Sequence, residues 1–229
     1  MSMQSRLRTR GILMLLVFAG VLIGIFSPIF PGKVNGLDYL DNLFNMVSKG
    51  SSYFVADWMG ASEKYDGQML DVTINMADES QAQETARLLE AAGATAAVSG
   101  AELKVSGDMG QIMKNSLADS DLMFHNDSAP LQQKYGYDGR QVLYNWWLAF
   151  KAINQDLTAQ EQFAAAKTFA SITTKVLEPA YNYYGVEAKS WKENISMILL
   201  ALGFYVLYTV WYGFGLMYLF EGLGLKIGH

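Results

Sequence analysis

The sequence predicts an α+β, mainly α, membrane protein in which two transmembrane helices enclose a helical extracytoplasmic region and a small β-α-β-β-α module. Two stretches without a charged residue, 11–30 and 194–220, predict the transmembrane helices. At 1.5 Å per residue they reach about 30 and about 40 Å, enough to cross a hydrocarbon core of about 30 Å. Between them, a stretch that alternates apolar and polar residues predicts strands.

We expect the chain to be organised in consecutive segments. These are a cytoplasmic N-terminus (1–10), transmembrane helix 1 (11–30), an amphipathic helix region (31–65), a small α+β periplasmic module (66–125), periplasmic or interfacial helices (126–193), transmembrane helix 2 (194–220) and a cytoplasmic C-terminus (221–229).

The composition argues against several kinds of partner and cofactor. The formal net charge is −5, and residues 31–194 carry 13 Lys and Arg against 21 Asp and Glu. Such an acidic region argues against nucleic acid as a partner, because phosphate binding needs a basic surface. The sequence has no cysteine, which excludes disulfides, iron–sulfur clusters, cysteine-ligated zinc and c-type haem attachment. His125 and His229 are its two histidines, which argues against a bis-histidine haem within one chain, and we expect no cofactor.

The first apolar stretch has features of both a signal peptide and a membrane anchor. Three arginines between residues 6 and 10 precede it, as in the basic region of a signal peptide. We interpret it as an uncleaved signal anchor, because no small-x-small cleavage pattern follows and Pro28 and Pro31 end the helix. The positive-inside rule then places the N-terminus in the cytoplasm, and an even number of spans returns the C-terminus there. We therefore expect a bacterial inner-membrane protein with residues 31–193 in the periplasm.

Gly20 and Gly24 form a GxxxG pattern within this stretch. The spacing lets two helix backbones approach closely, so both glycines are candidates for a partner-helix contact. One candidate partner is the second span of the same chain. Alternatively, the pattern reflects only the general frequency of glycine in membrane helices.

Residues 37–59 show the periodicity of an amphipathic helix, with a polar face that includes Lys49. The helix could lie on the membrane surface or pack on protein. We favour packing on protein, because the polar face is poor in lysine and arginine. Residues 49–52 are a candidate break in the helix.

Residues 66–125 predict the small module. Residues 70–76 alternate as in a half-buried strand, residues 78–92 have helical periodicity with Gly93 as the stop, and a hairpin is predicted around residues 99–101 before a further helix. The order is one strand short of a ferredoxin-like fold.

The alanine-rich helix, Gly93 and the following Lys104-Val105-Ser106-Gly107 are loosely similar to the peptidoglycan-binding SPOR domain over about fifty residues. The arginine-rich third strand and the final strand of such domains are not evident here, so no glycan site is carried over. We favour a structural module for assembly.

An acidic cluster with one imidazole is the best candidate metal site in the sequence. It consists of Asp119, Asp121, His125 and Asp127. Oxygen and imidazole ligands suit several divalent ions, but the spacing matches neither an EF-hand nor a His-Glu-x-x-His helix. We interpret the cluster as a solvated helix end and expect no bound metal.

The region before the second span is rich in aromatic residues. Residues 140–154 predict a helix that is apolar nearly all round, so Trp146 and Trp147 must be buried or lie at the headgroup level. Residues 158–161 resemble a capping box, which predicts a further helix that runs to about Leu177 and stops or kinks at Pro179. The predicted interfacial anchors are Trp146, Trp147, Tyr183, Tyr184 and Trp191.

The second span carries a polar stripe at helical spacing, formed by Tyr205, Tyr208, Thr209 and Tyr212. Hydroxyl groups near the middle of a membrane need partners. We therefore expect this face to contact another helix, a cofactor or water rather than lipid. Residues 190–193 form a capping box, which predicts that the helix starts outside the bilayer.

The sequence offers no recognisable nucleophile with a base and no phosphate-binding loop, so we predict no catalytic residue. The leading hypothesis is a non-catalytic accessory or scaffold subunit of a multi-subunit inner-membrane complex. Its expected partners are membrane lipid and other integral membrane subunits or copies of itself. The alternative is a homo-oligomeric two-span channel or transport ring with a periplasmic domain. A lipid- or quinone-directed enzyme and a cell-wall-binding module are weaker alternatives.

Overall fold

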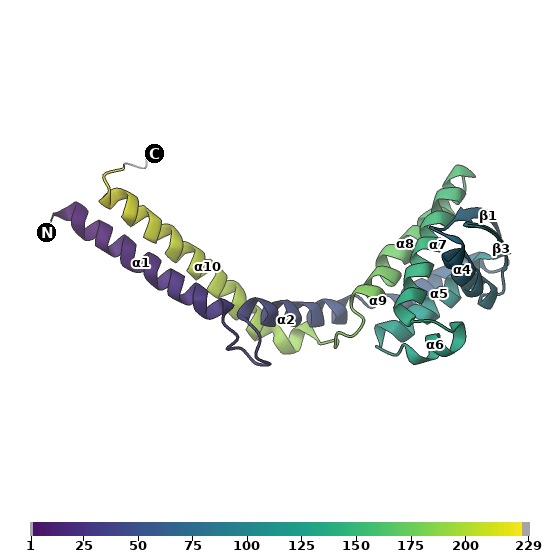
Figure 1. The fold of residues 1–229 in the computed structure, drawn as a ribbon, viewed down its shortest axis with the longest axis horizontal. Coiled ribbons are helices and arrows are strands. Elements are labelled where there is room, and N and C mark those ends of the chain that lie inside the picture. The colour runs from purple at the N-terminus through teal and green to yellow at the C-terminus, as the bar shows by residue number, and fades with distance from the viewer. Residues whose placement is uncertain (1, 226–229) are drawn as a thin grey trace. The chain divides into compact units, whose positions relative to one another are not determined.

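The computed structural model of the protein describes residues 2–225, which are mostly helical (Figure 1). The chain divides into two compact units. Unit 1 comprises Met1–Ser48 and Ala188–His229, and unit 2 comprises Lys49–Glu187. Unit 1 is therefore built from two separate stretches of sequence, and unit 2 is inserted between them.

Unit 1 is built on a pair of long helices, α1 (Met3–Phe26) and α10 (Trp191–Gly222), which lie side by side (Figure 1). Among residues 2–225, these two helices are long and apolar enough to cross a membrane. They run antiparallel, since Gly11 meets Leu219 whereas Phe18 meets Tyr208. A Cβ atom at Gly11 would lie 2.5 Å from the backbone nitrogen of Leu219, so the missing side chain lets the two backbones touch.

The limits of α1 differ from the predicted span of residues 11–30. The helix begins a full two turns earlier, where the Ser2 hydroxyl accepts from the Ser5 backbone N–H. It ends at Phe26, and Ser27 takes an extended backbone (φ −83°, ψ 146°). This conformation is the one favoured immediately before a proline, here Pro28.

The predicted amphipathic helix of residues 37–59 is two helices, α2 (Gly36–Ser51) and α3 (Val55–Ser62). The break follows the cluster of residues 49–52, as predicted. In unit 1, Leu43 of α2 is buried whereas Phe44 is exposed, and the carbonyl of Met46 accepts from the backbone N–H of Lys189 at 2.9 Å.

Unit 2 contains the predicted β-α-β-β-α order. The elements are β1 (Met69–Asn75), α4 (Glu79–Ala91), β2 (Thr95–Ser99), β3 (Glu102–Asp108) and α5 (Met109–Phe124). In residues 69–108 the strands form one antiparallel sheet of order β1-β3-β2, with Val72 opposite Val105. Strand β3 thus lies between two strands that run parallel to each other, which is the split βαβ arrangement. Alternate residues of β1 are buried, as the sequence pattern predicts.

The remaining helices of unit 2 complete its core. They are η1 (Glu63–Tyr65), α6 (Ala129–Tyr135), α7 (Gly139–Ala159), α8 (Phe163–Ile172), the π-helix η2 (Thr173–Leu177) and α9 (Glu178–Asn182). Helix α7 contacts both α8 and strand β1 (Figure 1). Its residues Trp146 and Phe150 are among the largest fully buried side chains. The core is therefore centred on α7.

The prediction that a helix starts at Thr158 is wrong. Thr158 lies in the last turn of α7, where its hydroxyl donates backward to the Asn154 carbonyl at 2.7 Å instead of capping a following helix. Glu161 then takes a left-handed backbone (φ 61°), which separates the two helices. Helix α8 begins only at Phe163. The predicted kink is found, since a π-helix precedes α9, which carries Pro179 in its first turn.

Candidate functional site

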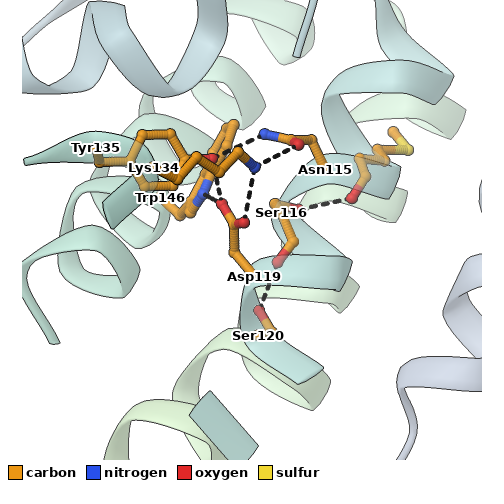
Figure 2. Close-up of polar contacts among 8 residues, drawn as sticks. Asn115, Ser116, Asp119, Ser120, Lys134, Tyr135 and Trp146 are labelled. Carbon is orange, nitrogen blue, oxygen red and sulfur yellow. Dashed lines mark hydrogen bonds and ion pairs between the residues drawn. The ribbon is translucent and has the colours of Figure 1, made fainter. Parts of the chain in front are cut away.

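Asp119 on α5 lies at the centre of a buried polar cluster in unit 2 (Figure 2). Its Oδ2 atom accepts hydrogen bonds from the Tyr135 hydroxyl at 2.6 Å and from the Trp146 indole Nε1–H at 2.8 Å. Its Oδ1 atom forms an ion pair with Lys134 Nζ at 3.0 Å. Both carboxylate oxygens are therefore occupied by protein donors that come from α6 and α7.

The electrostatics of this cluster keep its tyrosine neutral. Burial, followed by the negative charge of Asp119 and the hydrogen bond to it, raises the pKa of Tyr135 far above its usual value. Asn115 completes the network, since its amide donates to the Tyr135 hydroxyl and accepts from Lys134 (Figure 2). A carboxylate with this set of donors ties α5, α6 and α7 together. Both of its oxygens accept from these donors, so we assign it a structural role.

The structure separates the residues of the candidate metal site. Asp119 points into the core, whereas Asp121 accepts from the Tyr53 hydroxyl at 2.8 Å and lies beside His125. The hydrogen bond to Asp121, with burial and the carboxylate charge, raises the pKa of Tyr53. Among residues 2–225, no three His, Cys, Asp or Glu side chains are grouped as metal ligands.

Trp146 and Trp147 differ in their surroundings although they are adjacent in sequence. Trp146 is 0% exposed, so the prediction of an interfacial anchor is wrong for this residue. Its indole N–H is satisfied by Asp119, which explains how a polar edge is accommodated inside the core. Trp147 lies at the surface of unit 2 and donates from Nε1 to Glu178 Oε1 at 2.9 Å.

Two hollows border Trp147. The first, of about 290 Å³, is lined by Leu143, Tyr144, Trp147, Leu177, Glu178, Tyr181 and Asn182. The second, of about 210 Å³, includes Lys151, whose Nζ lies 4.1 Å from the centroid of the Trp147 ring. The π-helix η2 positions their shared carboxylate, because the Glu178 N–H bonds to the Thr173 carbonyl across the wider π turn. Such π turns are frequent at functional sites. These hollows are the best candidate binding site in unit 2. The sequence predicted Trp147 as an interfacial anchor and did not predict a cavity beside it.

Tyr183 and Tyr184 belong to unit 2, and α10 belongs to unit 1. The Tyr184 hydroxyl donates to Ser128 Oγ at 2.8 Å, and the guanidinium of Arg140 lies 5.4 Å from its ring centroid. The carbonyl of Tyr183 accepts from Lys49. These contacts give both tyrosines a role inside the unit, whereas Trp191 opens α10 and is exposed.

Lys49 is buried, whereas the helical periodicity of residues 37–59 predicted it on a polar face. It is 1% exposed, and its ammonium donates to Asn126 Oδ1 at 2.8 Å and to the carbonyls of Tyr183 and Val186 at 3.0 and 2.7 Å. Burial lowers the pKa of Lys49. The ammonium thus joins the first residue of unit 2 to Val186 near its end, and its three acceptors are all neutral oxygens.

The polar stripe of α10 divides into two parts. The Tyr208 hydroxyl donates to the Phe18 carbonyl of α1 at 2.8 Å, and both Tyr208 and Tyr212 have rings against Phe18. Thr209 bonds to the carbonyl of Tyr205 within α10. Tyr205 itself is 67% exposed. The structure therefore pairs part of the stripe with α1 and leaves Tyr205 facing outward.

The predicted glycine contact is not made within unit 1. A Cβ atom at Gly20 or Gly24 would meet no described atom within 4 Å, so the second span is not the partner of this face. The close contacts are at Gly11, Gly215 and Gly222, where Gly222 approaches the backbone of Arg8. A contact of Gly20 and Gly24 with another chain stays a prediction.

No protein-family model matches this chain, and comparisons with curated proteins and with solved structures give no match either. The loose likeness to SPOR domains over about fifty residues is therefore not supported by a family match.

Proposed function

We propose that this chain is a non-catalytic accessory or scaffold subunit of a multi-subunit complex in the bacterial inner membrane. In this proposal α1 and α10 cross the membrane, both termini are cytoplasmic, and residues 31–193 are periplasmic. Its partners are membrane lipid and other integral membrane subunits.

The outward position of Tyr205 is the observation that carries the proposal. This residue lies one turn from Tyr208 on α10, and among the described residues no hydrogen bond from its hydroxyl is found. Hydrocarbon offers no hydrogen-bond partner to a hydroxyl group. A polar group or a backbone carbonyl of a neighbouring helix would supply one, as the Phe18 carbonyl does for Tyr208.

The orientation follows from charge. Arg6, Arg8 and Arg10 occupy the first turns of α1, and cytoplasmic flanks are rich in arginine and lysine. Arg8 lies against Gly222, so these arginines and the end of α10 share one end of the hairpin. Both ends would then lie on the same side of the membrane.

Purification of the full chain from its native membranes in a mild detergent tests the proposal. We expect co-purifying membrane proteins in fixed proportion, and recovery reduced severalfold by Tyr205→Leu. The matched control is Leu207→Ala, since Leu207 is also exposed on α10 but has no hydroxyl. A monodisperse monomer without partners would overturn the proposal, as would equal recovery with Tyr205→Leu.

The second candidate is a homo-oligomeric channel or transport ring. It is favoured by the open face at Gly20 and Gly24, which a second copy of α1 could approach closely. Gly20→Leu with Gly24→Leu should then reduce the mass of the purified oligomer to that of a single chain. Particles that contain this chain alone in several copies would favour this candidate over the first.

A further inference from the structure

We propose that the hollow beside Trp147 binds a small organic cation, of the quaternary or alkylated ammonium class. The site is the 290 Å³ hollow defined above, whose walls include three aromatic rings and one carboxylate. Its volume is close to the lower end of the range of small-molecule pockets, about 300–1,000 Å³.

The charge of the lining favours a cation. Glu178 is its charged residue, and no lysine or arginine lines it. One Glu178 oxygen accepts from Trp147, which fixes the carboxylate beside the indole and leaves the second oxygen facing no other described donor. The surrounding unit is acidic as well, with 10 Lys and Arg against 18 Asp and Glu in residues 49–187. An anionic ligand would meet repulsion both locally and from the unit as a whole.

The aromatic rings of this region already hold cations elsewhere on their surfaces. The Lys151 ammonium lies 4.1 Å from the Trp147 ring centroid, in the second hollow, and the Arg140 guanidinium lies 5.9 Å from the Tyr181 centroid. Neither cation lines the first hollow. Tyr144 and Trp147, which both line the first hollow, are stacked with their ring centroids 6.0 Å apart. No lysine or arginine of the described chain lines this hollow, and a cation over an aromatic face is stabilised by about 0.5–2 kcal/mol.

The apolar part of the lining selects among cations. Leu143 and Leu177 join Tyr144, Trp147 and Tyr181 in the walls, and a single carboxylate does not supply the several oxygen ligands that a metal ion needs. A bare ammonium would leave N–H donors unpaired against these surfaces. Methyl or alkyl groups on the nitrogen avoid this cost and bury apolar area.

Isothermal titration of the full chain in a maltoside detergent, which carries no ammonium group, tests the site. We expect saturable binding of choline and at least tenfold weaker binding of its neutral isostere 3,3-dimethyl-1-butanol. Glu178→Gln keeps an acceptor for Trp147 but removes the charge, and it should weaken choline binding about tenfold. The matched control is Glu90→Gln, an exposed residue of α4 with the same change in charge, and it should leave binding unchanged.

The source of the cation is distinguished by a second titrant. Dihexanoyl-phosphatidylcholine that binds as tightly as choline, and is weakened equally by Glu178→Gln, would assign the site to a lipid headgroup. Binding of choline alone would assign it to a free cation. Absence of saturable binding of both, equal binding of the neutral isostere, or an unchanged affinity in Glu178→Gln would each overturn the proposal. Tyr181→Leu removes an exposed aromatic ring from the lining of the hollow. It should weaken choline binding while circular dichroism shows that the chain remains folded.

Discussion

Two tryptophans illustrate how differently the two units satisfy polar groups. In unit 2, Trp146 is fully buried and donates to the Asp119 carboxylate at 2.8 Å. In unit 1, Trp211 is 44% exposed and donates to the Met14 backbone carbonyl of α1 at 3.0 Å. A closed core can hold a charged acceptor because further donors surround it. Residues 11–26 of α1 include no charged side chain, so Trp211 uses a backbone carbonyl there, and Tyr208 does the same.

Unit 2 buries its apolar side chains in a core of its own, whereas most of the apolar side chains of α1 and α10 in unit 1 are exposed. The hydrophobic core of unit 2 is formed by residues between Val55 and Ala180, and many residues of α7 belong to it. Along α10, by contrast, Gly215 is the buried residue. The hairpin is stabilised by backbone proximity and a few aromatic contacts, and most of its remaining surface is exposed.

Removal of the Asp119 carboxylate is expected to give the largest effect. Asp119→Ala leaves the Tyr135 hydroxyl, the Trp146 N–H and the Lys134 ammonium without their common acceptor. The free energy of unfolding of unit 2 should fall by about 3–5 kcal/mol, measured by urea unfolding of the full chain in detergent and near-ultraviolet circular dichroism. The control is Asp121→Ala on the same helix, which loses exposed contacts and should cost less than about 1 kcal/mol. Equal effects of both variants would contradict the assigned role.

Crowding the helix contact at Gly11 should weaken the hairpin of unit 1. Gly11→Leu places a side chain against the Leu219 backbone, and overpacking costs about 1–3 kcal/mol. The readout is disulfide formation between Met14→Cys and Gly215→Cys, since a Cβ at Gly215 lies 3.4 Å from the Met14 Cβ and the chain has no other cysteine. Gly20→Leu meets no neighbour and should leave the yield unchanged; a similar drop in both variants would disprove this helix register.

Tyr135 should make the stability of unit 2 depend on pH above pH 10. Its raised pKa means that the folded chain keeps a phenol proton that the unfolded chain loses near pH 10. This contribution is complete below pH 10 and is lost as the pH rises, by about 1.4 kcal/mol per pH unit. Tyr135→Phe should reduce the slope of the unfolding free energy against pH between pH 10 and 12. Part of the dependence should remain, because burial also raises the pKa of Tyr137.

Lys49 changes the free energy of unfolding with pH in the direction opposite to Tyr135, so the wild-type chain and Tyr135→Phe must be compared with each other. Its lowered pKa means that the unfolded chain binds more protons, so its contribution rises between that pKa and about pH 10.5. Lys49 is present in both the wild-type chain and Tyr135→Phe, and its contribution cancels in the difference. Identical slopes for the two chains would show that the Tyr135 phenol titrates freely.

The smallest expected effect concerns the hydroxyl of Tyr208. Tyr208→Phe removes its hydrogen bond to the Phe18 carbonyl but keeps the stacked ring, and interhelical hydrogen bonds in membranes average about 0.6 kcal/mol. The equilibrium of the engineered disulfide should shift about threefold toward the reduced form. Tyr205→Phe, on the outward face, should leave the disulfide equilibrium unchanged. A larger shift for Tyr205→Phe than for Tyr208→Phe would mean that Tyr205, and not Tyr208, bonds to α1.

Local periodicity predicted most of the fold, because it records which face of an element is buried. The alternation in β1, the helical spacing of residues 78–92 before Gly93 and the hairpin predicted around residues 99–101 identified the module in the right order. Helix limits were less predictable, because Thr158 and Glu161 match a capping box in sequence while Glu161 takes a left-handed backbone that ends α7. The choice between these two uses depends on how α7 and α8 pack, which a short sequence window does not contain.

The buried polar groups could not be predicted for a related reason. Lys49 has the local sequence of a solvated helix end, and its acceptors Asn126 and Val186 are 77 and 137 residues away. The acceptor of Trp146 is 27 residues away, on another helix. The sequence therefore predicted that the tryptophan helix needs cover but could not distinguish a protein core from a membrane interface.

The contact made by Lys49 bears on whether the two units could be separated from each other by protein engineering. Its ammonium holds the beginning of unit 2 against Val186 near its end, and in unit 1 the carbonyl of Met46 is bonded to the N–H of Lys189. Each unit thus brings its own two connecting points together, which is the connectivity of a domain insertion. A short glycine-serine turn in place of residues 49–186 would span such neighbouring ends. The hairpin and the inserted domain could therefore be produced separately, because the two chain ends of each unit lie close together.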